Sequence, residues 1–201
     1  ALHLALKTLG IGPGDEVILP NLTFIATEAA VTYCNAKPIL VDVDSDSFTI
    51  MPKEIRRKIT SKTKAIIPVH YAGQSCDLDE IINISKEYNI PIVEDCAHAL
   101  GSKYHKKFVG TFGDFGCFSF YPTKIITTGE GGMVVSKKRN HCNKINLLRS
   151  QGINISPLKR ELKNKWNYDV NEIGFNYRLD EIRSALGLSQ FKRINQSIKL
   201  R

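Results

Sequence analysis

The stretch KAIIPVHYAGQSCDLDEIINISKEYNIPIVED, residues 64–95, carries the pattern that decides the fold. An apolar run over 64–70 predicts a strand, because it is short and bounded by polar and turn residues. Apolar residues at helical spacing over 77–89 predict an amphipathic helix, and the apolar run over 90–95 predicts a second strand. A strand, a helix and a strand in this order favour a βαβ unit, in which the two strands lie parallel in one sheet.

The same alternation continues on the N-terminal side of this unit. After an opening helix in an apolar pattern, four further segments are predicted to form a strand, a helix, a strand and a helix in turn: 12–20, 23–35, 37–44 and 52–60. A parallel sheet built from such units is covered by helices on both faces. The predicted fold class is therefore α/β, with three layers (α/β/α) around a mostly parallel sheet.

The pattern changes after Gly113. Two short strands are predicted within 114–122 and 131–136, followed by a helix over 137–149. We expect the polar stretch from there through Tyr168 to be a mobile or partner-contacting loop. A final helix is predicted over 180–194, and four of its residues near helical spacing are expected to face the core: Ile182, Ala185, Leu186 and Phe191.

The composition is that of a soluble globular protein. The chain has 201 residues, of which 42% are hydrophobic and 24% are charged. No apolar run reaches the ~18 residues of a membrane span, and the first residues lack the features of a signal peptide. Five widely spaced cysteines without a CxxC pair favour neither a disulfide framework nor a zinc site. We therefore expect a cytoplasmic protein that does not bind a membrane.

The formal net charge of +8 raises the alternative of a nucleic-acid-binding module. Most of the excess charge is scattered along the chain. The one dense cluster, LKRELKNK at 158–165, has no interleaved aromatic residue, and such a cluster is typical of a solvated helix face or a loop. We therefore expect no nucleic-acid partner, although the charge is compatible with anionic small substrates.

Polar side chains follow the predicted strands, where open α/β sheets bind their ligands. Asp42 and Asp44 follow one strand, His70 follows another, and Glu94 and Asp95 end a third. Asp95 is the strongest candidate, because an apolar strand precedes it and small residues follow it. Its carboxylate would then face a partly desolvated cavity and need a cationic partner. The alternative is that Asp95 only caps the turn after it.

His98 lies three residues after Asp95, a spacing that could place both on one side of a turn. Such a pair can also bind a metal, but no third ligand has a convincing spacing. The segment DVDSDS at 42–47 begins like a calcium loop, yet Ser47 occupies the position that requires glycine and Lys53 that of the bidentate acid. We therefore expect no metal site.

Lys124 lies in FSFYPTKIITTGEGG, residues 118–132, among aromatic and β-branched residues. It could be an ordinary lysine whose stem packs while its ammonium reaches solvent. Held among apolar groups, however, its amine would lose its proton more readily and could attack a carbonyl. Ser119 is predicted on the strand face opposite Phe118 and Phe120, and the glycines after Lys124 would let the backbone approach a ligand closely.

Three of these groups are the parts that a pyridoxal phosphate site requires. The cofactor acts as an electron sink while its ring nitrogen stays protonated, which a buried carboxylate such as Asp95 would ensure. Lys124 would hold the cofactor as a Schiff base, and Ser119 would bind its phosphate. The order of carboxylate, serine and lysine along the chain is compatible with a cofactor at the edge of the sheet.

Five ordered motifs resemble those of one family of pyridoxal phosphate enzymes, the DegT/DnrJ/EryC1/StrS aminotransferases, and the similarity extends over 1–201. The resemblance implies the large domain of the aspartate-aminotransferase type, which is fold type I. It also implies amino transfer from glutamate to a nucleotide-linked keto sugar, in amino-sugar, polysaccharide or lipopolysaccharide biosynthesis. The motifs are PGDEVILPNLTFIATEAAV (13–31), PVHYAGQSCDLDEI (68–81), VEDCAHALG (93–101), FSFYPTKIITTGEGGMV (118–134) and GFNYRLDEIRSALGLSQF (174–191).

The resemblance assigns roles to the residues that match these motifs. Lys124 would bind the cofactor and carry the proton, and Asp95 would pair with the pyridine nitrogen. His98 would contact the phenolic oxygen, where many relatives have glutamine. Ser119 would bind the phosphate, and Phe24 would stack on the ring.

The last motif implies a partner. Asn176 would reach the phosphate of the neighbouring subunit's cofactor, so the resemblance implies a homodimer with shared active sites. A related dehydratase branch has histidine at the position of Lys124, which favours transamination over dehydration. The alternatives are a pyridoxal-phosphate-dependent sugar dehydratase, a regulatory or non-catalytic homologue, and an inactive remnant.

Three features depart from the family pattern. Relatives carry a phosphate loop of the Gly-Thr/Ser-Ala type before the segment that matches the first residues, and they continue into a small C-terminal domain. We therefore expect 1–201 to be a cofactor-binding large domain that lacks both parts. Gln151 stands where histidine is frequent, which puts a substrate role at that position in doubt.

Overall fold

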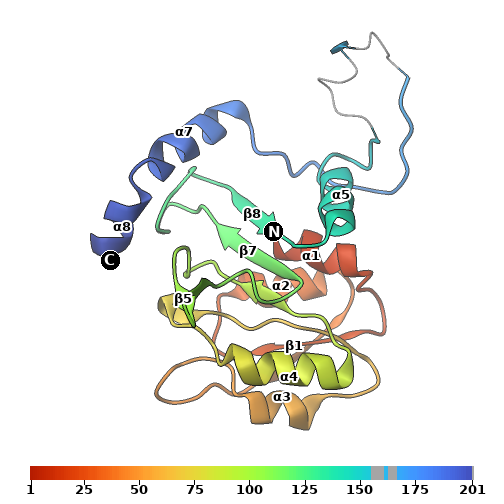
Figure 1. Cartoon of the computed structure of the whole chain (residues 1–201). Coiled ribbons are helices and arrows are strands. Elements are labelled where there is room, and N and C mark those ends of the chain that lie inside the picture. Colours follow the sequence, from red (N-terminus) through yellow and green to blue (C-terminus); the bar gives the residue numbers. More distant parts are fainter. Residues whose placement is uncertain (155–160, 163–166, 201) are drawn as a thin grey trace.

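The computed structural model describes residues 1–154, 161–162 and 167–200, and Figure 1 shows their arrangement. The main sheet consists of β1 (Glu16–Pro20), β2 (Lys37–Val41), β3 (Thr63–Ile66), β4 (Val93–Asp95), β7 (Phe115–Ser119) and β8 (Gly132–Val135). It has two three-stranded parts, in the orders β2-β1-β3 and β4-β7-β8.

The strands of this sheet are mostly parallel, as predicted. β1 lies parallel to β2 and β3, β4 lies parallel to β7, and β8 runs antiparallel beside β7. Parallel bridges from Ile66 to Ile92 and from Val69 to Asp95 join the two parts. The carboxyl ends of β3 and β4 therefore meet at one edge, next to Asp95.

Helices cover both faces of the sheet. α1 (Leu2–Leu9), α2 (Ile25–Thr32) and α5 (Arg139–Leu148) cover one face, and α3 (Pro52–Lys58) and α4 (Leu78–Tyr88) cover the other. Successive residues of β1 alternate between these faces: Val17 and Leu19 pack with the first set of helices and Ile18 with the second. Figure 1 shows α3 and α4 together on one side of the strands. The three-layer α/β/α prediction is confirmed.

Local sequence explains where α4 begins and ends. Asp77 is its N-cap, and its side chain accepts a hydrogen bond from the Glu80 amide at 3.3 Å. Asn89 ends the helix in the left-handed conformation, with φ of 53°, which asparagine tolerates better than most residues. Between these caps Leu78, Ile81 and Ile84 are fully buried, so the helix of the predicted βαβ unit packs through its apolar side.

A short hairpin between β4 and β7 was not predicted. Its strands are β5 (Lys103–Tyr104) and β6 (Lys107–Phe108), which pair antiparallel. The two turn residues, His105 and Lys106, both have positive φ, 43° and 67°. Turns of this kind normally use asparagine, aspartate or glycine, so the basic segment gives no sequence signal for a hairpin.

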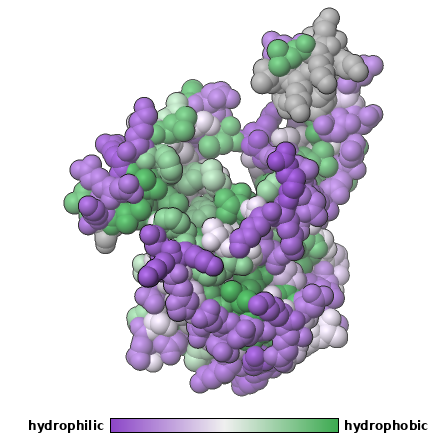
Figure 2. Space-filling view, in the orientation of Figure 1, coloured by the Kyte–Doolittle hydropathy of each residue, from purple (hydrophilic) through white to green (hydrophobic). Residues whose placement is uncertain are grey.

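The prediction that the last helix faces the core is wrong. A helix does form there, α7 (Glu181–Phe191), although it ends three residues before the predicted end and α8 (Ile194–Leu200) follows it. Neither helix has a buried residue. All four residues expected in the core are exposed, Ile182 to 85%. Figure 1 shows both helices outside the layers, and Figure 2 shows apolar surface between them and the sheet. The apolar residues do share helical spacing, but no element of the described chain buries their side chains.

Two further expectations concern the C-terminal half and the membrane. The predicted mobile or partner-contacting loop and the basic cluster at 158–165 lie mostly outside the described residues. No helix in the described part of the chain has the length and apolar character to cross a lipid bilayer.

Candidate active site

Asp95 ends β4 and is buried, with 5% of its surface exposed. Its Oδ2 accepts a hydrogen bond from the Thr27 hydroxyl at 2.9 Å, and its Oδ1 accepts one from the Ala97 amide at 3.0 Å. Oδ1 thus caps the turn after β4, which is the alternative role that the sequence left open. Oδ2 is held by Thr27 of α2. Among the described residues no cationic nitrogen lies within the 4.0 Å ion-pair distance of this carboxylate.

A cavity of about 310 Å³ lies beside this strand end. Lys124 and His98 both line it, although they are far apart in the sequence. Ala97, whose amide binds Asp95, also lines it. The complete lining is Tyr71, Ala72, Ala97, His98, Thr123, Lys124 and Ile125.

Lys124 is only partly buried, but its surroundings change its proton affinity. Burial lowers the pKa of Lys124 below its usual value, and the negative charge of Asp95 offsets this in part. The neutral amine, which is the form that attacks a carbonyl, is therefore more accessible than in an ordinary surface lysine.

His98 presents a defined ring nitrogen. Its Nδ1 accepts a hydrogen bond from the Ala72 amide at 3.3 Å, so in the neutral ring the proton lies on Nε2. Burial lowers the pKa of His98, Lys124 lowers it further, and Asp95 opposes both. The neutral ring with an Nε2–H donor is thus favoured. Such a donor suits the predicted contact with a phenolic oxygen.

Lys124 and His98 line the cavity, whereas the other four predicted site residues, Asp95, Ser119, Phe24 and Asn176, are not among its lining residues. Ser119 ends β7, and its hydroxyl accepts a hydrogen bond from the Tyr121 amide at 3.3 Å. Phe24 is the N-cap of α2 and is 74% exposed, three residues before the Thr27 that binds Asp95. Asn176 is exposed, and its Oδ1 accepts a hydrogen bond from the Arg178 side chain at 3.1 Å. The roles of these residues stay predictions.

The sequence suggested that the glycines after Lys124 let the backbone approach a ligand closely. In the structure at least two of them have another use. A Cβ added to Gly131 would lie 2.3 Å from the Thr128 hydroxyl oxygen, and one added to Gly132 would lie 2.7 Å from the Phe118 carbonyl oxygen. These two glycines let the β7–β8 hairpin pack against its own chain. Gly129, with φ of 77°, has open space around it and supplies a turn.

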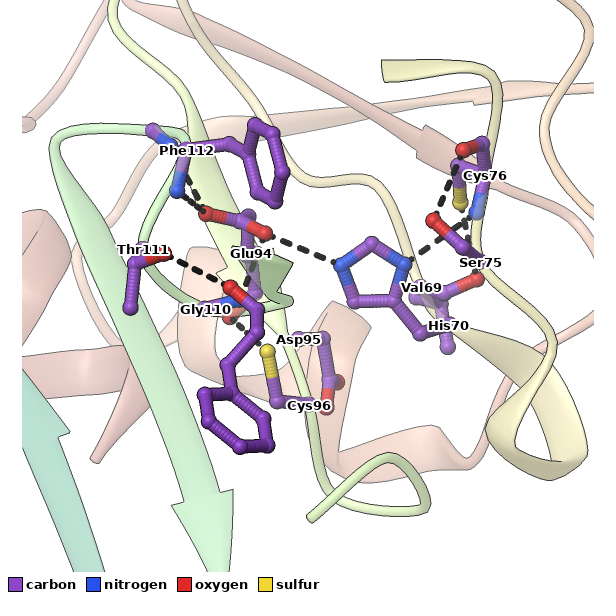
Figure 3. A network of polar contacts seen from close by, with 12 residues as sticks. Val69, His70, Ser75, Cys76, Glu94, Asp95, Cys96, Gly110, Thr111 and Phe112 are labelled. Atoms are coloured by element: carbon purple, nitrogen blue, oxygen red, sulfur yellow. Dashed lines mark hydrogen bonds and ion pairs between the residues drawn. The ribbon is translucent and has the colours of Figure 1, made fainter. Parts of the chain in front are cut away.

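Sequence reasoning missed a buried network on the opposite side of β4, drawn in Figure 3. Glu94 is fully buried, and its oxygens accept hydrogen bonds from the His70 ring at 3.1 Å and from amides of the segment 110–113. Ligand atoms of His70, Glu94 and Cys96 lie within 4.8 Å of one another, the spacing of a metal site. Because hydrogen bonds already occupy the Glu94 oxygens and both His70 nitrogens, a hydrogen-bonded network explains this cluster.

Sequence reasoning also missed Thr27 and Tyr71. Thr27 is 1% exposed and binds Asp95, and its hydroxyl lies 2.8 Å from that of Thr23. The paired threonines lay within the helix predicted over 23–35, where a spacing of four would place both hydroxyls on one side. In the structure α2 begins at Ile25, so Thr23 reaches Thr27 from the turn before the helix. No local signal placed Tyr71 at the cavity.

Comparison with known proteins gives a family. The family model described as DegT/DnrJ/EryC1/StrS aminotransferase family matches residues 1–201. Over 201 residues the chain is 45% identical to a GDP-perosamine synthase of Caulobacter vibrioides, and the match covers 100% of the chain and 52% of that protein. The chain thus spans about half the length of the curated relatives it matches.

Solved structures with the same fold support the comparison. An aminotransferase from Psychrobacter cryohalolentis has a TM-score of 0.89 and 36% identity, over 97% of this chain and 50% of that one. A putative sugar aminotransferase from Streptococcus pneumoniae in its PMP-form has a TM-score of 0.89 and 34% identity, over 98% and 54%. Its PLP-form has a TM-score of 0.87 at the same identity, over 98% and 53%. Fold type I and pyridoxal phosphate, both expected from the sequence, are confirmed for the family.

Proposed function

The chain belongs to the DegT/DnrJ/EryC1/StrS aminotransferase family, and from this premise we propose that its protein moves an amino group from glutamate to a nucleotide-linked keto sugar. One observation carries the proposal. Lys124 and His98 face one cavity, and Ala97 links that cavity to the buried carboxylate of Asp95. We also propose that 1–201 is the cofactor-binding large domain of this enzyme.

The residues fit pyridoxal phosphate, because Asp95 is a buried carboxylate whose hydrogen bonds from the described residues come from a hydroxyl and an amide. A carboxylate in this position is expected to need a positive partner, and a protonated pyridine nitrogen would supply one. Lys124 would hold the cofactor covalently, and His98 would donate to its phenolic oxygen. Phe24 would lie on the ring, and Ser119 would bind the phosphate. When bound, the cofactor supplies an electron sink for the reacting carbon.

The chain's own residues would orient groups and move the proton. The Lys124 amine, with its lowered pKa, can take a proton from the amino-bearing carbon of the donor in the first half of the reaction. In the second half its ammonium form can give a proton to the sugar carbon that receives the amino group. The Thr27 hydroxyl donates a hydrogen bond to one Asp95 oxygen and so holds the carboxylate in place. The Nε2–H of His98 keeps a fixed donor at the cavity.

The substrate class is drawn from the relatives. The Caulobacter protein is named a GDP-perosamine synthase and the Streptococcus protein a putative sugar aminotransferase, which supports a sugar linked to a nucleotide. The choice of glutamate as donor rests on the family resemblance. The five free cysteines support the further proposal of a reducing, cytoplasmic location.

We also propose a homodimer with shared active sites. The exposed apolar residues of α7, among them Ile182 and Phe191, would be covered by a second copy. Asn176 is exposed, and Arg178 takes up its Oδ1, so the amide NH₂ group is left as the donor that an anion such as a phosphate would need.

Borohydride trapping tests the cofactor role of Lys124. The full-length protein, mixed with pyridoxal phosphate, reduced and digested, should carry the added pyridoxyl mass on the peptide that contains Lys124. In the Lys124→Arg variant, which keeps the positive charge, the corresponding peptide should carry no pyridoxyl mass. Amino transfer from glutamate to a panel of nucleotide-linked keto sugars then tests the activity. A folded protein that stays unmodified at Lys124 would leave only fold and ancestry in common with the family.

A further inference from the structure

The geometry points to Glu94 and His70 as positioning residues that hold the cavity-lining segment after β3 and, through it, the ring of His98. Neither residue lines the cavity. The catalytic meaning of this inference rests on the proposed function, whereas the geometric coupling does not.

Glu94 ties three segments together. Its Oε1 accepts hydrogen bonds from the amides of Phe112 and Gly113, at 2.8 and 2.7 Å. Its Oε2 accepts from the Gly110 amide at 2.7 Å and from His70 Nε2 at 3.1 Å. Four hydrogen-bond donors therefore surround one fully buried carboxylate, about as many as its two oxygens can accept. Because Glu94 and Asp95 are consecutive on β4, their side chains point to opposite faces.

His70 passes this constraint to the next segment. Its Nδ1 accepts a hydrogen bond from the Cys76 amide at 3.2 Å, which closes the loop from 70 to 76. Its main-chain amide donates to the Asp95 carbonyl at 3.1 Å. With Nδ1 as an acceptor and Nε2 as a donor to Glu94, the ring has one neutral tautomer that satisfies both contacts.

The closed loop carries Tyr71 and Ala72, which line the cavity. Ala72 has a positive φ of 50°, an uncommon conformation for alanine that its surroundings must maintain. The amide of this same residue donates to His98 Nδ1 at 3.3 Å. Glu94 therefore acts on His98 through two intermediates, His70 and the Ala72 amide.

Glu94→Gln breaks this relay with little change of shape. Glutamine replaces one acceptor oxygen by an NH₂ donor. On the Oε1 side this NH₂ group would meet two amide donors, those of Phe112 and Gly113. It is therefore expected on the Oε2 side, where it faces the Gly110 amide and the His70 ring, whose tautomer can change. If His70 changes tautomer to accept from that NH₂, its Nδ1–H meets the Cys76 amide, so two donors face each other. Either way the loop from 70 to 76 loses a contact and the Ala72 amide loses its fixed position.

Nitrogen-15 NMR of histidine-labelled, full-length protein without cofactor tests the coupling, with the His98 signals assigned from His98→Asn. In the wild type we expect the Nε2–H tautomer of His98. In Glu94→Gln its ratio to the Nδ1–H tautomer should fall about fivefold, the effect of losing one ordinary hydrogen bond. Ile84→Val, a core change in α4 that does not touch the network, should leave the ratio unchanged. An unchanged ratio in folded Glu94→Gln would overturn the inference.

A second pair of variants keeps the test decisive if Glu94→Gln does not fold. His70→Asn can place an oxygen near the former Nδ1 and accept from the Cys76 amide, whereas His70→Gln places its amide near the former Nε2 and cannot. The His98 tautomer ratio should fall more in His70→Gln than in His70→Asn. Equal ratios in both variants would contradict the relay. Because no cofactor or substrate is present, this result is independent of whether the protein proves to be an aminotransferase.

Discussion

The Thr27 hydroxyl lies 2.9 Å from Oδ2 of Asp95, although the two residues are 68 positions apart in the chain. The contact joins α2 to the end of β4, and both side chains are almost fully buried. It sets the direction of the carboxylate that is proposed to face the cofactor. A positioning contact this deep in the core should affect both stability and activity.

Thr27→Val removes that hydroxyl with almost no change in shape. We expect the free energy of unfolding to fall by about 1–3 kcal/mol, because a buried carboxylate oxygen loses its donor. Urea unfolding of the full-length protein measures this change. Thr32→Val, at an exposed position in the same helix, should stay within about 0.5 kcal/mol of the wild type. Equal losses in both variants would show that the Asp95 contact is not the cause.

Lys124→Ala should lower kcat for amino transfer by at least about 100-fold, since it removes the proposed proton carrier. Lys124 has no buried ion pair to lose among the described residues, so folding should survive the change. Steady-state kinetics, with circular dichroism as the folding control, measures the effect. Normal turnover in a folded Lys124→Ala protein would remove this residue from the mechanism.

Asp95→Asn keeps the size of the side chain but removes its charge. A neutral amide cannot keep a pyridine nitrogen protonated, so we expect kcat to fall while the affinity for the nucleotide-linked sugar stays nearly constant. Separate measurements of kcat and KM check this split. A variant whose KM rises at unchanged kcat would place Asp95 in substrate binding instead.

Lys124 should make stability depend on pH. Burial lowers its pKa in the folded state, and Asp95 restores it only in part. Between that lowered pKa and the usual value of 10.5 the unfolded chain binds more protons, so the free energy of unfolding rises with pH across this window. At neutral pH Lys124→Met should therefore be more stable than the wild type, by a margin that shrinks at alkaline pH. Urea midpoints over a pH series, with the exposed Lys86→Met as control, measure the trend; a margin that widens at alkaline pH would contradict it.

The exposed face of α7 should decide the oligomeric state. Ile182→Arg places a charge where a second copy is proposed to bury an isoleucine, and we expect the dimer dissociation constant to rise about 10- to 100-fold. Ser189→Arg adds the same charge at another exposed position of the helix. Sedimentation of the full-length protein compares the two. A dimer equally stable in both variants would place the interface elsewhere.

Local patterns explain why much of the fold could be predicted from the sequence. The strand and helix spacing of 64–95, with the caps Asp77 and Asn89, depends on neighbours along the chain. The helical spacing of α7 was equally readable, but which surface its apolar side meets is not a local property. The prediction for Ile182 failed for that reason.

The sequence by itself determined the α/β fold class, the family, and the candidate pair Lys124 and Asp95, because each is carried by residues close together in ordered motifs. Only the tertiary structure decided that Thr27 holds Asp95, that His98 presents Nε2–H, and that Glu94 is tied to His70. These contacts join residues 24 to 68 positions apart, which parallel strands bring together only when their register is set. Packing of the whole sheet sets that register, and no single stretch of sequence contains it.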